Sequence, residues 1–262
     1  FFPRLEVAGA AIATALGCFI AFLMSVQSLV SPKSKLRLTL KKSWLPSREV
    51  LAPVGEISFS AFVEQLCMRL GFFLYALIVA GLGTKMFATH QICMNICNIC
   101  FSCYDGFAAA AAALVGQNLG RRRSDRAECV TVICNRLAMT MAVLMVAGLI
   151  LFRAPLIQMF TADPEIIRLG SWIMILFALS VPSLSAMTVY GGALRGAGDT
   201  RLIAVYALVS TTIIRPALSW LLCYPVGLGV IGPWIGLLVD FVLRFVLCRR
   251  RYQTGLWKQR VY

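Results

Sequence analysis

Charged side chains within apolar stretches are the residues of this sequence that could do chemistry. Asp105 lies in "CYDGFAAAA", Glu64 and Arg69 share an earlier apolar run, and Arg215 directly precedes a proline in a later one. A charged side chain at the centre of a bilayer costs about 2.5–3.5 kcal/mol on insertion scales, so the ones that a membrane protein keeps are candidates for function. If these stretches cross a membrane, the four side chains are candidates for ion coupling or substrate binding.

Two carboxylates, Asp105 and Glu64, could take up a coupling ion. Asp105 is expected near the middle of its stretch, beside Gly106, where a helix could open; the alternative is a hydrogen-bonded structural aspartate next to a kink. Glu64 could bind an ion or a cationic substrate, or it could cap a helix or extend toward the membrane surface. Asp240 also lies within an apolar stretch, but no motif surrounds it. We therefore rank Asp105 first and Glu64 second.

The basic candidates, Arg69 and Arg215, have different expected roles. Arg69 follows Glu64 by five residues, which is about 140° around a helix, so these side chains do not face each other. Arg215 is expected to pair with a carboxylate or with carbonyls that the following proline leaves free. Aromatic residues close to Arg69 could line a cavity for an amphiphile, or they could pack or face lipid. These residues are Phe72, Phe73 and Tyr75.

A stripe of cysteines recurs at helical spacing. Its members are Cys93, Cys97, Cys100 and Cys103. Metal ligands must converge on one point, whereas this stripe extends over roughly 15 Å of helix axis. Small residues at helix contacts explain it better, so the sequence predicts neither a metal site nor a cofactor.

The composition indicates that the elements that position these residues are membrane helices. Of 262 residues, 60% are hydrophobic and 14% are charged, whereas soluble domains are about 25% charged. Seven stretches are long enough to cross about 30 Å of hydrocarbon. They are residues 7–32, 53–83, 86–116, 129–152, 167–190, 202–224 and 229–248. We expect an all-α, multi-pass integral membrane protein with about seven transmembrane helices.

The basic residues are distributed unevenly between alternate connections. Seventeen of the 25 Lys and Arg residues fall in the connections on one side and in the C-terminal tail, and three fall on the other side. The positive-inside rule then places the basic connections and the C-terminus in the cytoplasm of a cell with this protein in its plasma or inner membrane. Because the net charge of +14 is spread over separate connections, nucleic acid is not an expected partner.

A weak internal repeat suggests how the helices are grouped. Residues 5–22 and 228–245 share the pattern L-x-V-x-G-x-x-I. If the repeat is real, residues 1–30 form the last helix of an N-terminal lobe, 31–52 a basic cytoplasmic linker, and 53–262 a complete lobe of six helices. Duplicated membrane lobes are typical of secondary transporters.

Several motifs together resemble the C-terminal half of a multidrug and toxic compound extrusion (MATE) transporter. They are "THQI" at 89–92, "AALVGQNLGRRRSDRA" at 112–127, "GALRGAGDTR" at 192–201 and "LGVIGPWIG" at 228–236, with residues 64–83 similar to the seventh helix of that family. The resemblance implies two pseudo-symmetric lobes of six helices that export organic cations or other amphiphiles by antiport with Na⁺ or H⁺. It implies no enzyme activity, and it implies membrane lipids and a missing N-terminal lobe of the same polypeptide as partners.

The resemblance also assigns structural roles to residues of these motifs. They are His90, Gln91, Gly116, Gln117, Gly120, Arg195, Gly196, Gly198 and Asp199. His90 is expected to cap or pack near the outer end of its helix. Met68 stands where some members carry a carboxylate, and residues 167–190 contain no carboxylate, which argues against a sodium site of that kind in this lobe.

The island "GALRGAGDTR" is expected to form a tight cytoplasmic turn. Its glycines, Gly192, Gly196 and Gly198, would permit the turn. Asp199 would cap the following helix, and Arg195 and Arg201 would lie at the lipid headgroups.

Other classes of function fit less well. A flippase for a lipid-linked saccharide precursor would have similar paired lobes, but it would need several basic residues in the cavity for pyrophosphate. Only Arg69, Arg136 and Arg215 are candidates for that role. A metal or redox enzyme would need a ligand cluster that one histidine and the cysteine stripe do not supply.

Overall fold

The computed structural model describes residues 6–30 and 48–259. By internal contacts the chain divides into two compact units, residues 1–55 and 56–262. The first unit contains α1 (Glu6–Val30), whose side chains from Ile12 to Gln27 are exposed. The predicted linker at 31–52 falls largely outside the described residues.

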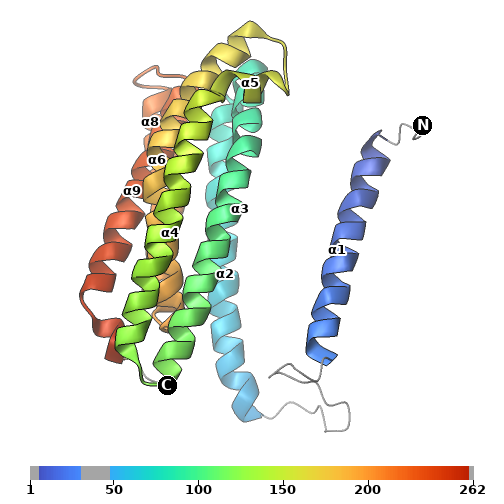
Figure 1. Cartoon of the computed structure of the whole chain (residues 1–262). Coiled ribbons are helices and arrows are strands. Elements are labelled where there is room, and N and C mark those ends of the chain that lie inside the picture. Colours follow the sequence, from blue (N-terminus) through green and yellow to red (C-terminus); the bar gives the residue numbers. More distant parts are fainter. Residues whose placement is uncertain (1–5, 31–47, 260–262) are drawn as a thin grey trace. The chain divides into compact units, whose positions relative to one another are not determined.

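The second unit is built of helices that run along one bundle (Figure 1). They are α2 (Arg48–Ala80, which begins in the first unit), α3 (Thr84–Gly120), α4 (Ser124–Leu151), α5 (Arg153–Gln158), α6 (Pro164–Gly196), α7 (Thr200–Leu208), the π-helix η1 (Val209–Ile214), α8 (Arg215–Cys223), α9 (Ile231–Gln253) and the 3₁₀-helix η2 (Leu256–Gln259). Five spans among the described residues are long and apolar enough to cross a membrane, with α7, η1 and α8 forming one of them. Shorter apolar stretches lie in α1 and α2. The expected all-α membrane fold is confirmed.

Helix α6 is the centre of the bundle and packs against α3, α4 and α9. In its most apolar window 56% of the residues are buried, compared with 22–44% in the other four spans. Ile173, Met174 and Phe177 of α6 are fully or almost fully buried, together with Cys97 of α3. Pro182 lies within α6 without ending it, as membrane helices tolerate.

Helices α3 and α6 cross so closely that side chains do not fit between them. A Cβ atom on Gly192 would lie 2.4 Å from the Ala108 carbonyl oxygen, and one on Gly196 would lie 2.2 Å from the Ala112 carbonyl oxygen. Small residues allow such backbone contact between membrane helices. The prediction that Gly192 and Gly196 form a turn is therefore wrong, because both lie within α6 and make this contact.

The turn itself is shorter than the island "GALRGAGDTR" suggested. It follows Gly196, and Gly198 adopts a φ of +81°, a conformation that glycine adopts at little cost. The Asp199 amide then donates to the carbonyl of Leu194 at 2.9 Å, which closes the end of α6.

Asp199 does not cap α7, contrary to the prediction. Its side chain makes no cap hydrogen bond to that helix. Its carboxylate is fully buried and accepts a hydrogen bond from Arg251 Nε of α9 at 2.6 Å. A buried carboxylate needs a charged or hydrogen-bonding partner, and the guanidinium of Arg251 meets that need from 52 residues away.

The connections fall at two ends of the bundle (Figure 1). One end, here called the basic end, holds the α3–α4 turn, the α6–α7 turn and the C-terminal part of α9. Its basic residues are Arg121, Arg122, Arg123, Arg126, Arg201, Arg249, Arg250, Arg251 and Lys258. Lys258 Nζ and Glu128 Oε2 form an ion pair across this end at 2.5 Å.

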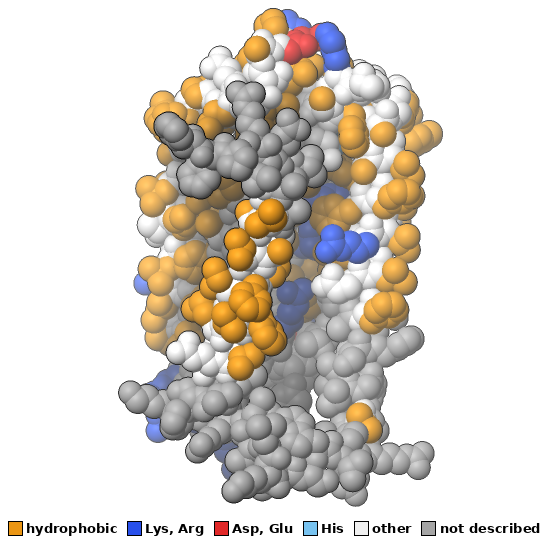
Figure 2. Space-filling model, turned by 90° about the vertical axis from the view of Figure 1, so that its right-hand side faces the viewer, with side chains coloured by type: hydrophobic (Ala, Val, Ile, Leu, Met, Phe, Trp, Pro, Cys, Tyr) orange, Lys and Arg blue, Asp and Glu red, His pale blue; other side chains and the backbone are white. Residues whose placement is uncertain are grey.

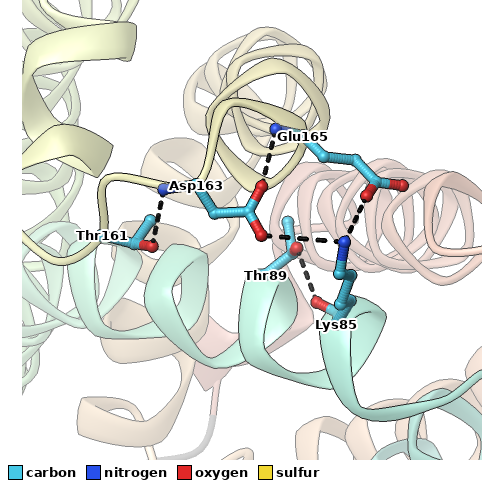
Figure 3. A network of polar contacts seen from close by, with 5 residues as sticks. All are labelled: Lys85, Thr89, Thr161, Asp163 and Glu165. Atoms are coloured by element: carbon cyan, nitrogen blue, oxygen red, sulfur yellow. Dashed lines mark hydrogen bonds and ion pairs between the residues drawn. The ribbon is translucent and has the colours of Figure 1, made fainter.

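At the opposite end, one lysine joins the starts of α3 and α6 (Figure 3). Lys85 Nζ lies 2.7 Å from Glu165 Oε2 and 3.8 Å from Asp163 Oδ2. Asp163 caps α6 by accepting a hydrogen bond from the Glu165 amide at 2.9 Å, and Pro164 occupies the first turn, where its missing N–H costs nothing. The segment that follows α5 is thus attached to α3 by charge.

Candidate functional site

A cavity of about 530 Å³ lies in the second unit among α2, α3, α6, α7, α8 and α9. This volume is within the usual range of small-molecule sites, roughly 300–1,000 Å³. Figure 2 shows basic side chains recessed below a mostly apolar surface. Aromatic side chains that line the cavity come from four different helices. They are Phe72, Phe101, Tyr104, Tyr206 and Phe241.

Basic residues predominate among the charged residues of the wall. Arg69, Arg195, Arg215 and Arg244 line the cavity, together with one carboxylate, Asp105. The structure thus brings together Asp105, Arg69 and Arg215, which the sequence had singled out as candidates.

Arg195 lines the cavity because α6 continues to Gly196, and so it does not belong to a turn as expected. Arg136, by contrast, is exposed on α4 and does not line the cavity.

Asp105 lies near the middle of α3, as expected, and its side chain is exposed on the cavity wall. Helix α3 continues without interruption from Thr84 to Gly120, so it does not open at Gly106. A Cβ atom on Gly106 would meet nothing within 4 Å, so neither the glycine nor its surroundings force a kink. The carboxylate is therefore accessible from the cavity.

Behind the wall, Asp240 of α9 joins two arginines in a buried cluster. Its Oδ2 lies 2.7 Å from Arg244 Nη2 and 3.7 Å from Arg215 Nε. Its Oδ1 accepts a hydrogen bond from the hydroxyl of Ser210 in the π-helix. Asp240 itself is fully buried. Arg215 thus has the carboxylate partner that was expected of it, and that partner is a residue to which the sequence had assigned no role.

The guanidinium of Arg215 is surrounded by aromatic rings. Its Cζ lies 5.2 Å from the ring centre of Phe72, 5.1 Å from that of Tyr75 and 5.7 Å from that of Phe241. Only 1% of the side chain is accessible to water, although the residue forms part of the cavity wall. Its Nε and Nη1 atoms donate no hydrogen bond within the described part of the chain.

Tyr75 and His90 lie behind this wall in the core. Their rings are 5.3 Å apart, and His90 lies 5.6 Å from Trp234. His90 is 3% exposed, so it packs inside the lobe, which is one of the two roles expected of it. Tyr75 is not among the residues that line the cavity, whereas Phe72 is, and Phe73 is 60% exposed elsewhere.

The other motif residues lie on α3, away from the cavity. Gln91, Gln117 and Gly120 are exposed, and a Cβ atom on Gly116 would lie 3.1 Å from the Gly196 carbonyl oxygen. The side chain of Glu64 lies outside the described part of the chain, so its place relative to the cavity stays a prediction.

The cysteine stripe packs in the core of the lobe. Cys93, Cys97 and Cys100 are buried, and Cys93 Sγ lies 3.9 Å from the Gly170 carbonyl oxygen of α6. Within residues that the structure describes, no group of three or more His, Cys, Asp or Glu side chains is arranged to hold a metal ion.

Comparisons with known proteins agree with this fold. The family model MatE matches residues 60–221. The "Probable multidrug resistance protein NorM" of Thermotoga maritima is 27% identical over 263 residues, which are 99% of this chain and 55% of that protein. The "Multidrug resistance protein MdtK" of Proteus mirabilis is 29% identical over 97% of this chain and 56% of its own length.

Solved structures share the fold at low sequence identity. The crystal structure of a MATE transporter in the straight conformation superposes with a TM-score of 0.83 at 20% identity, over 97% of this chain and 58% of that one. A multidrug resistance MATE family transporter in an outward-facing conformation gives 0.81 at 20% identity, over 95% and 56%.

Fold and comparisons together define a multi-pass integral membrane protein with the fold of MATE transporters. The chain belongs to the MatE family, whose members are transporters and not enzymes. It spans about half the length of the curated relatives that it matches. Their multidrug resistance names do not favour the alternative of a lipid-linked saccharide flippase.

Proposed function

We propose that residues 53–262 of this chain form the C-terminal lobe of a secondary active efflux transporter, and that residues 1–30 are the last helix of its N-terminal lobe. In this proposal the C-terminal lobe works with the N-terminal lobe of the same polypeptide and exports organic cations or other amphiphilic drugs in exchange for Na⁺ or H⁺. The supporting observation is the cavity of about 530 Å³ within an apolar lobe, with aromatic and charged side chains on its wall. The multidrug resistance names of the relatives point in the same direction.

Asp105 is our first candidate for coupling, and Glu64 is the second. The Asp105 carboxylate is exposed on the cavity wall, where ions and substrate would both reach it. Antiport requires one site whose occupancy changes the conformational preference of the protein. A carboxylate that exchanges a cation or proton with the cavity could provide such a site.

Efflux under imposed gradients tests this proposal. The complete transporter is placed in liposomes, and dye efflux is driven by a pH gradient or a Na⁺ gradient, for the wild type, Asp105→Asn and Glu64→Gln. Both substitutions keep the side-chain size and remove the charge. We expect Asp105→Asn to abolish the dependence on one of the two gradients. Wild-type efflux that responds to neither gradient would contradict the proposed antiport. Unchanged coupling in both variants would place the coupling site elsewhere.

We further propose that the basic end faces the cytoplasm. This orientation rests on the positive-inside rule and on the clustering of arginines at that end of the bundle. A cysteine placed at Ser124 in a cysteine-free background should react only with reagent on the cytoplasmic side. Reaction from outside would contradict the orientation.

A further inference from the structure

The cavity wall carries more positive charge than its buried carboxylate can balance. Arg215 and Arg244 share the carboxylate of Asp240, which leaves one guanidinium charge in this cluster without a counter-ion among the residues that the structure describes. Arg69 lines the same cavity and has neither an ion pair nor a hydrogen bond within the described part of the chain. The remaining carboxylate of the wall, Asp105, lies on α3.

Among the described residues, Arg215 has two buried donors without a hydrogen bond, whereas Arg244 has one, its Nε. Asp240 accepts its close hydrogen bonds from Arg244 and Ser210, whereas Arg215 Nε stays 3.7 Å from the nearest carboxylate oxygen. The Nε and Nη1 atoms are buried without hydrogen bonds. Burying polar donors without partners costs free energy, and membrane proteins keep such charged groups chiefly where they have a function.

The rings around Arg215 restrict how a partner can approach. Phe72 and Phe241 line the cavity and lie within 6 Å of the guanidinium carbon. Aromatic rings attract the face of a guanidinium but leave the N–H groups at its edge available. Nη1 shares an edge of the guanidinium with Nη2, and an oxyanion can accept from both N–H groups of such an edge at once, which is the geometry that guanidinium groups favour.

We propose that Arg215 binds the anionic group of an aromatic amphiphile in this cavity. The group is an oxyanion such as a carboxylate, sulfonate or phosphate, and the aromatic wall contacts the rest of the molecule. Arg69, which lies on α2, adds to the electrostatic attraction of this anionic group. This inference rests on the proposed function and specifies its substrates, which carry an anionic group as well as apolar rings.

Two dyes that differ in one group provide the test. Rhodamine 110 and rhodamine 123 have the same ring system, but the carboxyl group is free in rhodamine 110 and methylated in rhodamine 123. Binding of each dye to the complete transporter in phosphatidylcholine nanodiscs is measured by fluorescence anisotropy. The variants are Arg215→Gln and Arg69→Gln, with Arg136→Gln as the matched control because Arg136 is exposed on α4 outside the cavity.

We expect Arg215→Gln to weaken binding of rhodamine 110 roughly 10- to 100-fold, the range for losing a hydrogen bond to a charged group. Binding of rhodamine 123 should change less than about threefold. Arg69→Gln should show the same selectivity with a smaller effect, because this side chain is exposed and screened by water. Arg136→Gln should affect neither dye.

Several results would decide against the site. If Arg215→Gln and Arg69→Gln weaken both dyes equally, or affect neither, the proposal is overturned. Because Asp240 keeps Arg244 and Ser210 as partners in Arg215→Gln, we expect that variant to fold, and Arg69→Gln provides the test if it does not. If the transporter exports rhodamine 123 and the variants do not distinguish the two dyes, the proposed function stands and the anion site is overturned. If the protein binds rhodamine 110 through Arg215 but exports neither dye, the anion site stands and the proposed function is overturned.

A lipid phosphate could present the same chemistry as a soluble amphiphile. The rhodamine measurements are therefore repeated with increasing phosphatidylglycerol in the nanodisc. Selective weakening of rhodamine 110 binding would identify the lipid headgroup as an occupant of the anion site. Unchanged binding would support the site and assign it to soluble amphiphiles.

Discussion

The contact between α3 and α6 is made of glycines and alanines, whereas the wall that α2, α8 and α9 give to the cavity is made of arginines and aromatic rings. In the first region the backbones of the two helices touch, so the structure cannot accommodate a larger side chain there. In the second region two polar atoms of Arg215 have no hydrogen-bond partner among the described residues, so the structure keeps a charge there at a cost in free energy. We therefore expect the first region to hold the lobe together, and we propose that the second binds a ligand.

The largest expected effect comes from removing the carboxylate that connects the wall to the core. Asp240→Asn removes the carboxylate shared by Arg215, which is buried, and Arg244, which is 12% exposed, and breaking a buried pair in this way costs about 3–5 kcal/mol. Thermal unfolding of the purified protein measures the loss. The same substitution at Asp105, which is exposed, should change stability by no more than about 0.5 kcal/mol.

A double variant sharpens this prediction. Adding Arg244→Gln to Asp240→Asn removes one of the two stranded charges, so part of the lost stability should return. If Asp240→Asn unfolds at the wild-type temperature, the cluster does not stabilise the lobe, and the account of the wall is wrong.

A smaller effect is expected at the basic end, where a buried carboxylate holds the α6–α7 turn to α9. Asp199→Ala removes the hydrogen bond to Arg251 and should cost about 1.5–3 kcal/mol, the range for hydrogen bonds to charged groups. Asp125→Ala at the exposed start of α4 is the control, and it should cost no more than about 1 kcal/mol.

The same variants separate the ion pair from the helix cap that the sequence suggested. If Asp199 acts through Arg251, the effects of Asp199→Ala and Arg251→Ala on unfolding are not additive. Additive losses would mean that the two side chains act independently, which would contradict the contact as the source of stability.

The sequence predicted the helices well because the length and apolarity of a stretch are enough to recognise a membrane helix. It could not tell which glycines turn the chain and which allow two helices to touch. Gly192, Gly196 and Gly198 recur in one short motif, but only Gly198 has a positive φ. The contact that the other two make depends on Ala108 and Ala112, about 84 residues earlier.

The sequence predicted only part of the candidate site, because it shows which residues are charged but not which of them meet in the folded lobe. Arg69, Arg215 and Asp105 were found because each is charged within an apolar stretch. Asp240 and Arg244 carried the same signal, and their spacing of four residues places them on one helix face. Whether they meet Arg215 depends on how α9 is rotated against α8, and the length and apolarity of a stretch do not encode that rotation. The link between Asp199 and Arg251 likewise depends on tertiary structure.

The central claim is that the α3–α6 contact serves folding and the cavity charges serve a ligand. Thermal unfolding and rhodamine 110 efflux, measured per folded molecule on the same preparations of Gly192→Ala and Arg69→Gln, test it most directly. Gly148→Ala is the control, because a Cβ atom there meets nothing within 4 Å. We expect Gly192→Ala to lose about 1–3 kcal/mol of stability with little change in efflux per folded molecule, and Arg69→Gln to keep its stability and lose efflux several-fold. The reverse pattern, with Arg69→Gln unstable and Gly192→Ala stable but inactive, would contradict the account.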